Sequence, residues 1–196
     1  MRVDLRFNRR ARYFLALAAL LSVCLTSLAS YAAAAEQFDV LKFYETMFEA
    51  NGRTPKPIDP AALRLAEQLA EARQTRVVVD REIVVVGRAL VGFLVGRNPG
   101  KDMQVRLFFE HELTPALVRN VDTFRDLFAV AMAETFTIGE LEALKAQSNA
   151  NAGTLGTGEV KVAAERFHDV ASAFGGYVLS TIGRDPDHRL EQYGLH

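Results

Sequence analysis

Apolar side chains recur with the period of an α-helix along most of this chain, and that pattern constrains the fold more than any other feature. In the clearest stretch the spacing is 4, 3, 4 and 3 residues, through Leu117, Val121, Phe124, Phe128 and Ala131. Such spacing places the five side chains on one face of a helix, while the charged residues between them point to solvent. We therefore predict an all-α fold in which each helix buries an apolar face.

The segment from residue 76 to residue 96 is rich in valine, which favours strands by propensity. A hairpin turning near residues 80–82 is the alternative to a helix here. Helical spacing fits better, because the steps of 4, 3, 4 and 3 return through Val79, Ile83, Val86, Leu90 and Phe93. We predict a helix. Its Gly92 and Gly96 are interpreted as sites of close helix contact in the core rather than as a membrane dimerisation motif.

Capping residues predict where several helices begin. Asp59 followed by Pro60 supplies an N-cap oxygen and a first-turn proline, and Thr114 followed by Pro115 has the same form. Thr137 and Glu140 have the spacing of a capping box, in which the hydroxyl accepts from the N3 amide and the carboxylate accepts from the Thr137 amide.

These signals divide the chain after residue 35 into three parts. Residues 36–60 are expected to form an N-terminal helix, to about residue 50, and a proline-rich connector. Residues 61–183 are expected to form an antiparallel bundle, so that five to seven helices are predicted in all, with a glycine-rich break at 149–158. Residues 184–196 are predicted to be a polar, mobile tail.

The first 35 residues have the three parts of a secretory signal peptide. An apolar run over residues 13–29 ends in the alanines of 32–35 and is preceded by Arg2, Arg6, Arg9, Arg10 and Arg12. We predict that residues 1–35 are removed and that the protein is periplasmic. The alternative is an inner-membrane anchor formed by residues 13–35. A twin-arginine signal is disfavoured by Arg12, and a lipoprotein signal at Cys24 by the bulky Val23 before it.

Removal of this leader changes the composition on which partner predictions depend. The chain has 23 Lys+Arg and 24 Asp+Glu, and subtracting five arginines and Asp4 leaves 18 against 23, a formal charge of −5. That balance argues against nucleic acid as a partner. Cys24 is the single cysteine, so the mature chain is expected to form no disulfide and to depend on packing for stability. Membrane contact is expected only if the leader is retained.

One segment resembles a known family. The residues from Phe136 to Leu144, preceded by an amphipathic helix and followed by Gly153, are similar to the core of the bacterial family called domain of unknown function 2059. The resemblance covers best Leu117 to Phe167, although Gln147 and Ser148 stand where the family has an aromatic pair. It implies an exported, all-helical protein of undetermined biochemistry, and it supplies no catalytic residue.

The histidines and glycines provide the candidate sites for chemistry. Glu165 and His168 share a helix face, as in di-iron bundles, but the further glutamates and the second Glu-x-x-His of such a site are missing. His111 lies between two glutamates that diverge around a helix. The glycines of 153–158 precede a helix without the spacing of a phosphate-binding loop. We therefore assign no catalytic, metal or cofactor-binding residue, and we expect no cofactor.

Phenylalanine is frequent, with 13 in the chain, and this suggests an aromatic core. Phe108 and Phe109 are adjacent, so one ring is expected to face inward and the other partly outward, where it could line a groove for an apolar ligand or a partner helix.

The function predicted from the sequence is a non-catalytic binding or structural component of the bacterial envelope, with an envelope protein or an apolar ligand as partner. The first alternative is a carrier or sensor for an apolar small molecule or lipid. The second is an envelope hydrolase with dispersed catalytic residues. A contiguous apolar cavity would favour the carrier, and a cleft with converging carboxylates or histidines would favour the enzyme.

Overall fold

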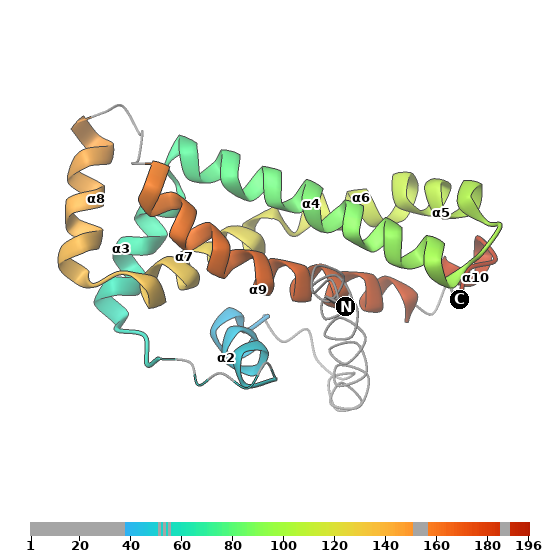
Figure 1. Cartoon of the computed structure of the whole chain (residues 1–196), viewed down its shortest axis with the longest axis horizontal. Helices are drawn as coiled ribbons and strands as arrows, with labels where there is room; N and C mark the ends of the chain where they lie inside the picture. Colours follow the sequence, from blue (N-terminus) through green and yellow to red (C-terminus); the bar gives the residue numbers. More distant parts are fainter. Residues whose placement is uncertain (1–37, 51, 53, 55, 151–156, 185–188) are drawn as a thin grey trace, which may run out of the picture. The chain divides into compact units, whose positions relative to one another are not determined.

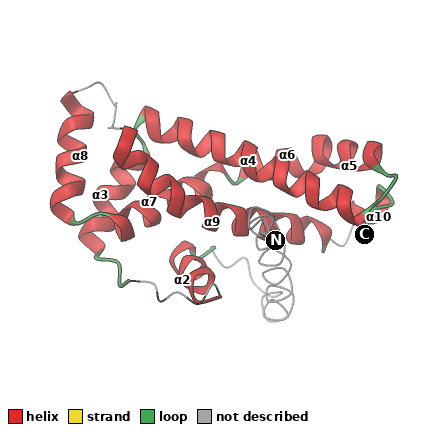
Figure 2. Ribbon diagram, in the orientation of Figure 1, coloured by secondary structure: helices red, strands yellow, loops and turns green. Residues whose placement is uncertain are grey.

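Helices form all the regular secondary structure in the described residues (Figure 2). The computed structural model describes residues 38–50, 52, 54, 56–150, 157–184 and 189–196. The predicted leader and its cleavage site therefore lie outside the described residues. Residues 39–196 form one compact unit. Its helices are α2 (Val40–Ala50), α3 (Pro60–Ala70), α4 (Arg73–Arg97), α5 (Asp102–Phe108), α6 (Thr114–Arg119), α7 (Val121–Thr135), α8 (Ile138–Ala150), α9 (Thr157–Gly183) and α10 (Arg189–Gln192).

Helix α7 is the centre of the fold. It packs against α2, α3, α4 and α9, and all seven of its residues from Leu127 to Ala133 are buried. A helix that is apolar on every side is stable only when neighbours cover it completely. Helices α2, α3, α4 and α9 therefore surround α7, and the prediction of an all-α helical bundle is confirmed.

Two long helices, α4 and α9, lie side by side against α7 (Figure 1). Both run in the same direction, opposite to α7 (Figure 1). The pair of α4 and α9 therefore lacks the antiparallel arrangement expected from the sequence, whereas α5 and α6 run back along α4 (Figure 1). The valine-rich segment is a helix and not a hairpin. Its buried face includes Val79, Val86 and Leu90, as the spacing predicted, and continues to Leu94.

The close contact between α4 and α9 involves neither of the predicted glycines. A Cβ atom on Gly92 or Gly96 would have no atom within 4 Å, because both residues are on the exposed side of α4. On Gly175 of α9, a Cβ atom would be only 2.1 Å from Cγ1 of Val86. The interpretation of Gly92 and Gly96 as core contacts is therefore wrong, and Gly175 has that role.

The prediction that Thr114 caps the start of a separate helix is also wrong. Helix α5 continues through a π-helical turn at Phe109–Leu113 into α6, and the Thr114 amide donates to the Phe109 carbonyl five residues earlier. Pro115 has no amide hydrogen, so the widened turn before it accommodates the ring within a continuous helical run. The break occurs instead at Asn120, whose side-chain amide donates to the Ala116 carbonyl at 2.8 Å. The described residues contain nine α-helices when α6 and α7 are counted separately on the two sides of this break and the short α10 is included.

Two of the three predicted caps are confirmed. The Asp59 carboxylate accepts from the Ala61 amide at 2.7 Å, and Pro60 is the first residue of α3. At the start of α8, the Glu140 carboxylate accepts from the Thr137 amide at 2.7 Å, and the Glu140 amide donates to the Thr137 hydroxyl at 3.4 Å. The Thr137 amide and, at 2.8 Å, the Thr137 hydroxyl both donate to the Glu140 carboxylate, and these two hydrogen bonds hold its pKa below the usual value.

The prediction of a mobile tail is wrong for residues 189–196. Leu195 is fully buried, and the Tyr193 ring packs edge-on against Phe108 with centroids 5.6 Å apart. The Asn98 side chain accepts from the His196 amide at 2.9 Å and donates to the His196 carbonyl at 3.3 Å. The polar composition of the segment led to the prediction of mobility, but Tyr193 and Leu195 pack against the bundle and hold the segment in place.

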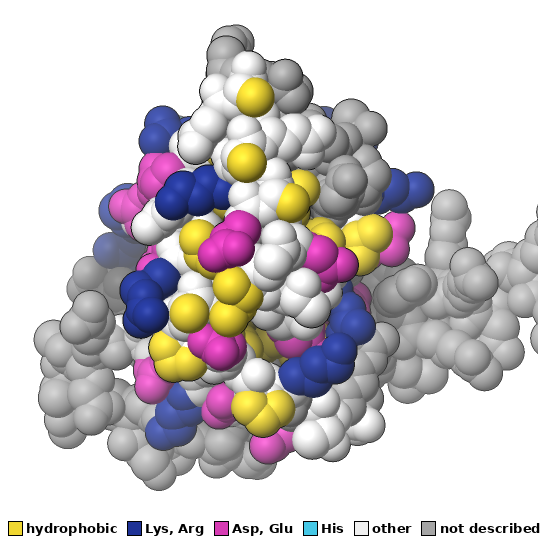
Figure 3. All heavy atoms as spheres, turned by 90° about the vertical axis from the view of Figure 1, so that its left-hand side faces the viewer, with side chains coloured by type: hydrophobic (Ala, Val, Ile, Leu, Met, Phe, Trp, Pro, Cys, Tyr) yellow, Lys and Arg dark blue, Asp and Glu magenta, His cyan; other side chains and the backbone are white. Residues whose placement is uncertain are grey.

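The surface of the bundle carries mixed charge where it is seen from the α3 and α8 end. Acidic, basic and apolar side chains are interspersed among the described residues of this face (Figure 3). Helix α8 itself turns Leu141, Leu144 and Ser148 inward against α3 and leaves its remaining side chains mostly exposed.

Candidate functional site

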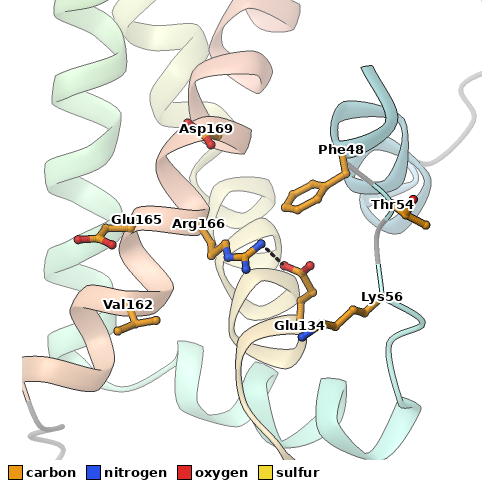
Figure 4. Close-up of a pocket in the computed structure, with 8 residues that line it drawn as sticks. All are labelled: Phe48, Thr54, Lys56, Glu134, Val162, Glu165, Arg166 and Asp169. Carbon is orange, nitrogen blue, oxygen red and sulfur yellow. Dashed lines mark ion pairs between the residues drawn. The ribbon is translucent and has the colours of Figure 1, made fainter. Parts of the chain in front are cut away.

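A pocket of about 650 Å³ lies where α2, the connector that follows it, α7 and α9 meet (Figure 4). Its volume is in the range that small-molecule sites have in proteins. Eight residues line it: Phe48 from α2, Thr54 and Lys56 from the connector, Glu134 from α7, and Val162, Glu165, Arg166 and Asp169 from α9.

Glu134 is the most buried charged group of the pocket. Its side chain is 4% exposed, although it belongs to the last turn of α7, where the helix dipole disfavours a carboxylate. Two partners compensate for the burial. The Tyr44 hydroxyl donates to Oε2 at 2.9 Å, and Nη1 of Arg166 lies 3.5 Å from the same oxygen. These contacts link α2, α7 and α9 through one carboxylate.

Two cationic side chains enter the pocket from opposite walls. In Figure 4, Arg166 extends from α9 and Lys56 from the connector, and both head groups point toward Glu134. The Arg166 side chain is 42% exposed, and Lys56 is exposed and forms no ion pair with the described residues. Positive charge is therefore accessible from the pocket.

The other acidic residues of the lining lie along α9. Glu165 and Asp169 are exposed, and Glu165 points away from Glu134 in Figure 4. The eight lining residues include no Ser, Cys or His, so the lining does not form the nucleophile and base pair of acyl-transfer enzymes. The arrangement is suited to holding a polar molecule by charge and hydrogen bonds.

The histidine candidates lie elsewhere. His168 does not meet Glu165; its Nδ1 is 2.5 Å from Oε1 of Glu82 on α4. This hydrogen bond raises the pKa of the His168 imidazole above its usual value of 6.5, against an opposing effect of burial. His111 is exposed on the π-helical turn. Among the described residues, no group of three or more His, Cys, Asp or Glu side chains is arranged to hold a metal ion.

The adjacent phenylalanines pack into the bundle. Phe108 is fully buried, and Phe109 is partly exposed, as predicted. The Phe109 ring lies against α4, with Cε2 3.3 Å from the position that a Cβ on Gly87 would occupy. The ring therefore fills the α4 interface instead of lining a groove. The glycine-rich candidate at 153–158 lies outside the residues whose side chains are described.

Sequence reasoning did not identify the pocket because its residues are far apart in the chain. Lys56, Glu134 and Arg166 come from three separate elements and match no motif. One local signal was present. Glu134 directly follows the run of seven buried residues in α7, and a carboxylate at the end of such a run needs a partner from another element.

Comparisons with protein-family models, with curated proteins and with solved structures give no significant match for this chain. In the described residues, no helix combines the length and the apolar character needed to span a membrane.

Proposed function

We propose that this protein is an exported, non-catalytic binding protein of the bacterial envelope, and that it holds a small polar ligand in the pocket between α2, α7 and α9. The observation that carries the proposal is the convergence of Arg166 and Lys56 on a pocket whose buried carboxylate, Glu134, is already compensated. Export rests on the signal-peptide pattern of residues 1–35. Membership of the family called domain of unknown function 2059 is part of the same proposal.

The pocket gives less support to the two alternatives. Five of its eight lining side chains are charged at neutral pH, whereas a carrier of lipids needs a mainly apolar cavity. A hydrolase of the acyl-transfer type needs a nucleophile beside a base, and this lining supplies neither a hydroxyl next to a histidine nor a thiol. A hydrolase of the carboxylate type needs two acidic side chains that face each other, whereas Glu165 points away from Glu134 (Figure 4).

Export is tested by expressing the full chain in a bacterium, separating the periplasm from the other fractions, and measuring the intact mass. Recovery from the periplasm, with a mass that corresponds to residues 36–196, is the expected result. A membrane-bound protein that retains residues 1–35 would contradict it and favour the anchor.

Binding is tested on the same preparation by native mass spectrometry. We expect a reproducible adduct of small-molecule mass that is lost on denaturation and is reduced in the Lys56→Gln variant. An adduct of lipid mass, unaffected by Lys56→Gln, would support the carrier instead.

A further inference from the structure

We infer that the ligand of this pocket is a small organic monoanion whose carboxylate binds between Arg166 and Lys56. The inference rests on the proposed binding function and names the chemical class of the ligand.

The first argument is the unused donor capacity of the two cations. A guanidinium carries five N–H donors, and the described contacts of Arg166 amount to one ion pair at 3.5 Å with Glu134. Its side chain is partly exposed, so part of the guanidinium is accessible from the pocket. Lys56 adds three donors from the opposite wall and has no ion pair with the described residues. Arginine binds carboxylates in a planar, bidentate manner, which suits a ligand carboxylate at this position.

The second argument is that Glu134 does not cancel this positive charge. It accepts a hydrogen bond from Tyr44 and lies next to Arg166, and it is nearly inaccessible to solvent. Counting Glu134, Arg166 and Lys56 together leaves one net positive charge where the two cations meet, while Glu165 and Asp169 bring the formal charge of the whole lining to −1. Glu134 is thus a positioning residue, because it holds the Arg166 guanidinium toward the pocket without consuming its donors.

The third argument limits the size and charge of the ligand. Glu165 and Asp169 lie on α9 next to Arg166, so an approaching polyanion meets two carboxylates. Phe48 and Val162 provide apolar surface at the same pocket, and Val162 is 49% exposed. A single carboxylate with a small apolar body satisfies both features better than inorganic phosphate does.

The test compares ligands of equal shape and different charge. We would measure binding of benzoate, butyrate, benzamide, butylamine and inorganic phosphate to the mature protein by calorimetry and by amide chemical shifts. Benzoate or butyrate is expected to bind with a Kd below about 1 mM. Shifts are expected in Arg166, Lys56 and their neighbours, with benzamide and phosphate at least about tenfold weaker.

Two variants that each remove one positive charge distinguish binding in the pocket from attraction by the overall charge of the protein. Lys56→Gln is expected to weaken benzoate binding about two- to fivefold, the effect of losing one exposed ion pair of about 0.5–1 kcal/mol. Lys161→Gln is the matched control, since Lys161 is an exposed lysine of α9 that does not line the pocket. It is expected to leave binding unchanged. Circular dichroism of both variants verifies that the helices are intact.

Several results would overturn the inference. Equal binding of benzoate and benzamide would show that the carboxylate is not recognised, and equal losses from Lys56→Gln and Lys161→Gln would place the effect outside the pocket. Binding of butylamine, with chemical-shift changes at the pocket, would contradict the inference that the ligand is an anion, but it would leave the proposed binding function intact. If no probe binds and no adduct co-purifies, both the anionic ligand and the proposed binding function are contradicted.

Discussion

At the scale of single residues, a buried charge depends on the few side chains that compensate it. Glu134 is the clearest case, because a carboxylate that is 4% exposed has only the Tyr44 hydroxyl and the Arg166 guanidinium as described partners. Loss of a partner leaves an uncompensated charge, which costs more than loss of both charges together.

We therefore predict that Arg166→Met destabilises the protein by about 1–2 kcal/mol, less than for a fully buried pair because Arg166 is partly exposed. Adding Glu134→Gln should recover part of this loss, since the amide oxygen still accepts from Tyr44 and carries no charge. Urea unfolding of the two single variants and the double variant measures the coupling. Additive effects would show that the two side chains do not interact.

The ion pair of His168 and Glu82 predicts a dependence of stability on pH. The hydrogen bond with Glu82 raises the His168 pKa, burial opposes it, and the charges of Glu82 and Asp169 raise it further. Since the folded pKa lies above 6.5, the stabilisation is fully present below that pH and is lost as the pH rises through the folded value.

The stability difference between the wild type and His168→Gln should therefore be largest in mildly acidic solution and disappear in alkaline solution. Unfolding midpoints over this range provide the measurement. His111→Gln is the control, because His111 is exposed on the π-helical turn. A difference that stays constant with pH would mean that His168 is not charged in the pair.

At the scale of elements, the contact between α4 and α9 depends on one glycine. Gly175→Ala would bring a Cβ to 2.1 Å from Val86 Cγ1, and a β-branched side chain has little freedom to move away. The adjacent Gly176 has no atom within 4 Å of the same position and serves as a matched control.

We expect Gly175→Ala to destabilise the protein by about 1–3 kcal/mol through overpacking. Gly176→Ala should stabilise it by up to about 1 kcal/mol through helix propensity. Thermal unfolding of both variants tests the pair. Similar shifts of the two midpoints, in either direction, would contradict the close contact.

The elements that could be predicted from the sequence are those determined by interactions between residues close together in the chain. Apolar spacing identified α4 and α9, and local hydrogen bonding identified the caps at Asp59 and Thr137. The π-helical turn was not predicted, because a threonine followed by proline has the same form whether a helix begins there or passes through. The site was not predicted, because Lys56, Glu134 and Arg166 meet only after the helices pack.

At the scale of the whole molecule, residues 189–196 belong to the packed structure. Leu195→Ala is expected to cost about 2–4 kcal/mol if the segment unfolds together with the bundle, as a fully buried leucine does in a core. If the segment opens independently, the cost appears instead as loss of amide protection confined to residues 189–196.

Hydrogen exchange of the wild type and of Leu195→Ala shows whether residues 189–196 unfold together with the bundle or open independently. Leu190→Ala is a useful comparison, because Leu190 is only partly buried in the same segment and should have a smaller effect. A variant with unchanged midpoint and unchanged exchange would contradict the packing of Leu195.

The central position of α7 has a consequence for the order in which the chain can fold. Its partners α2, α3 and α4 are synthesised before it, but α9, which covers the remaining side, is made last among them. Until residue 183 has left the ribosome, the apolar surface of α7 that α9 covers stays exposed, and the bundle cannot close. The complete bundle therefore forms only after α9 has been synthesised.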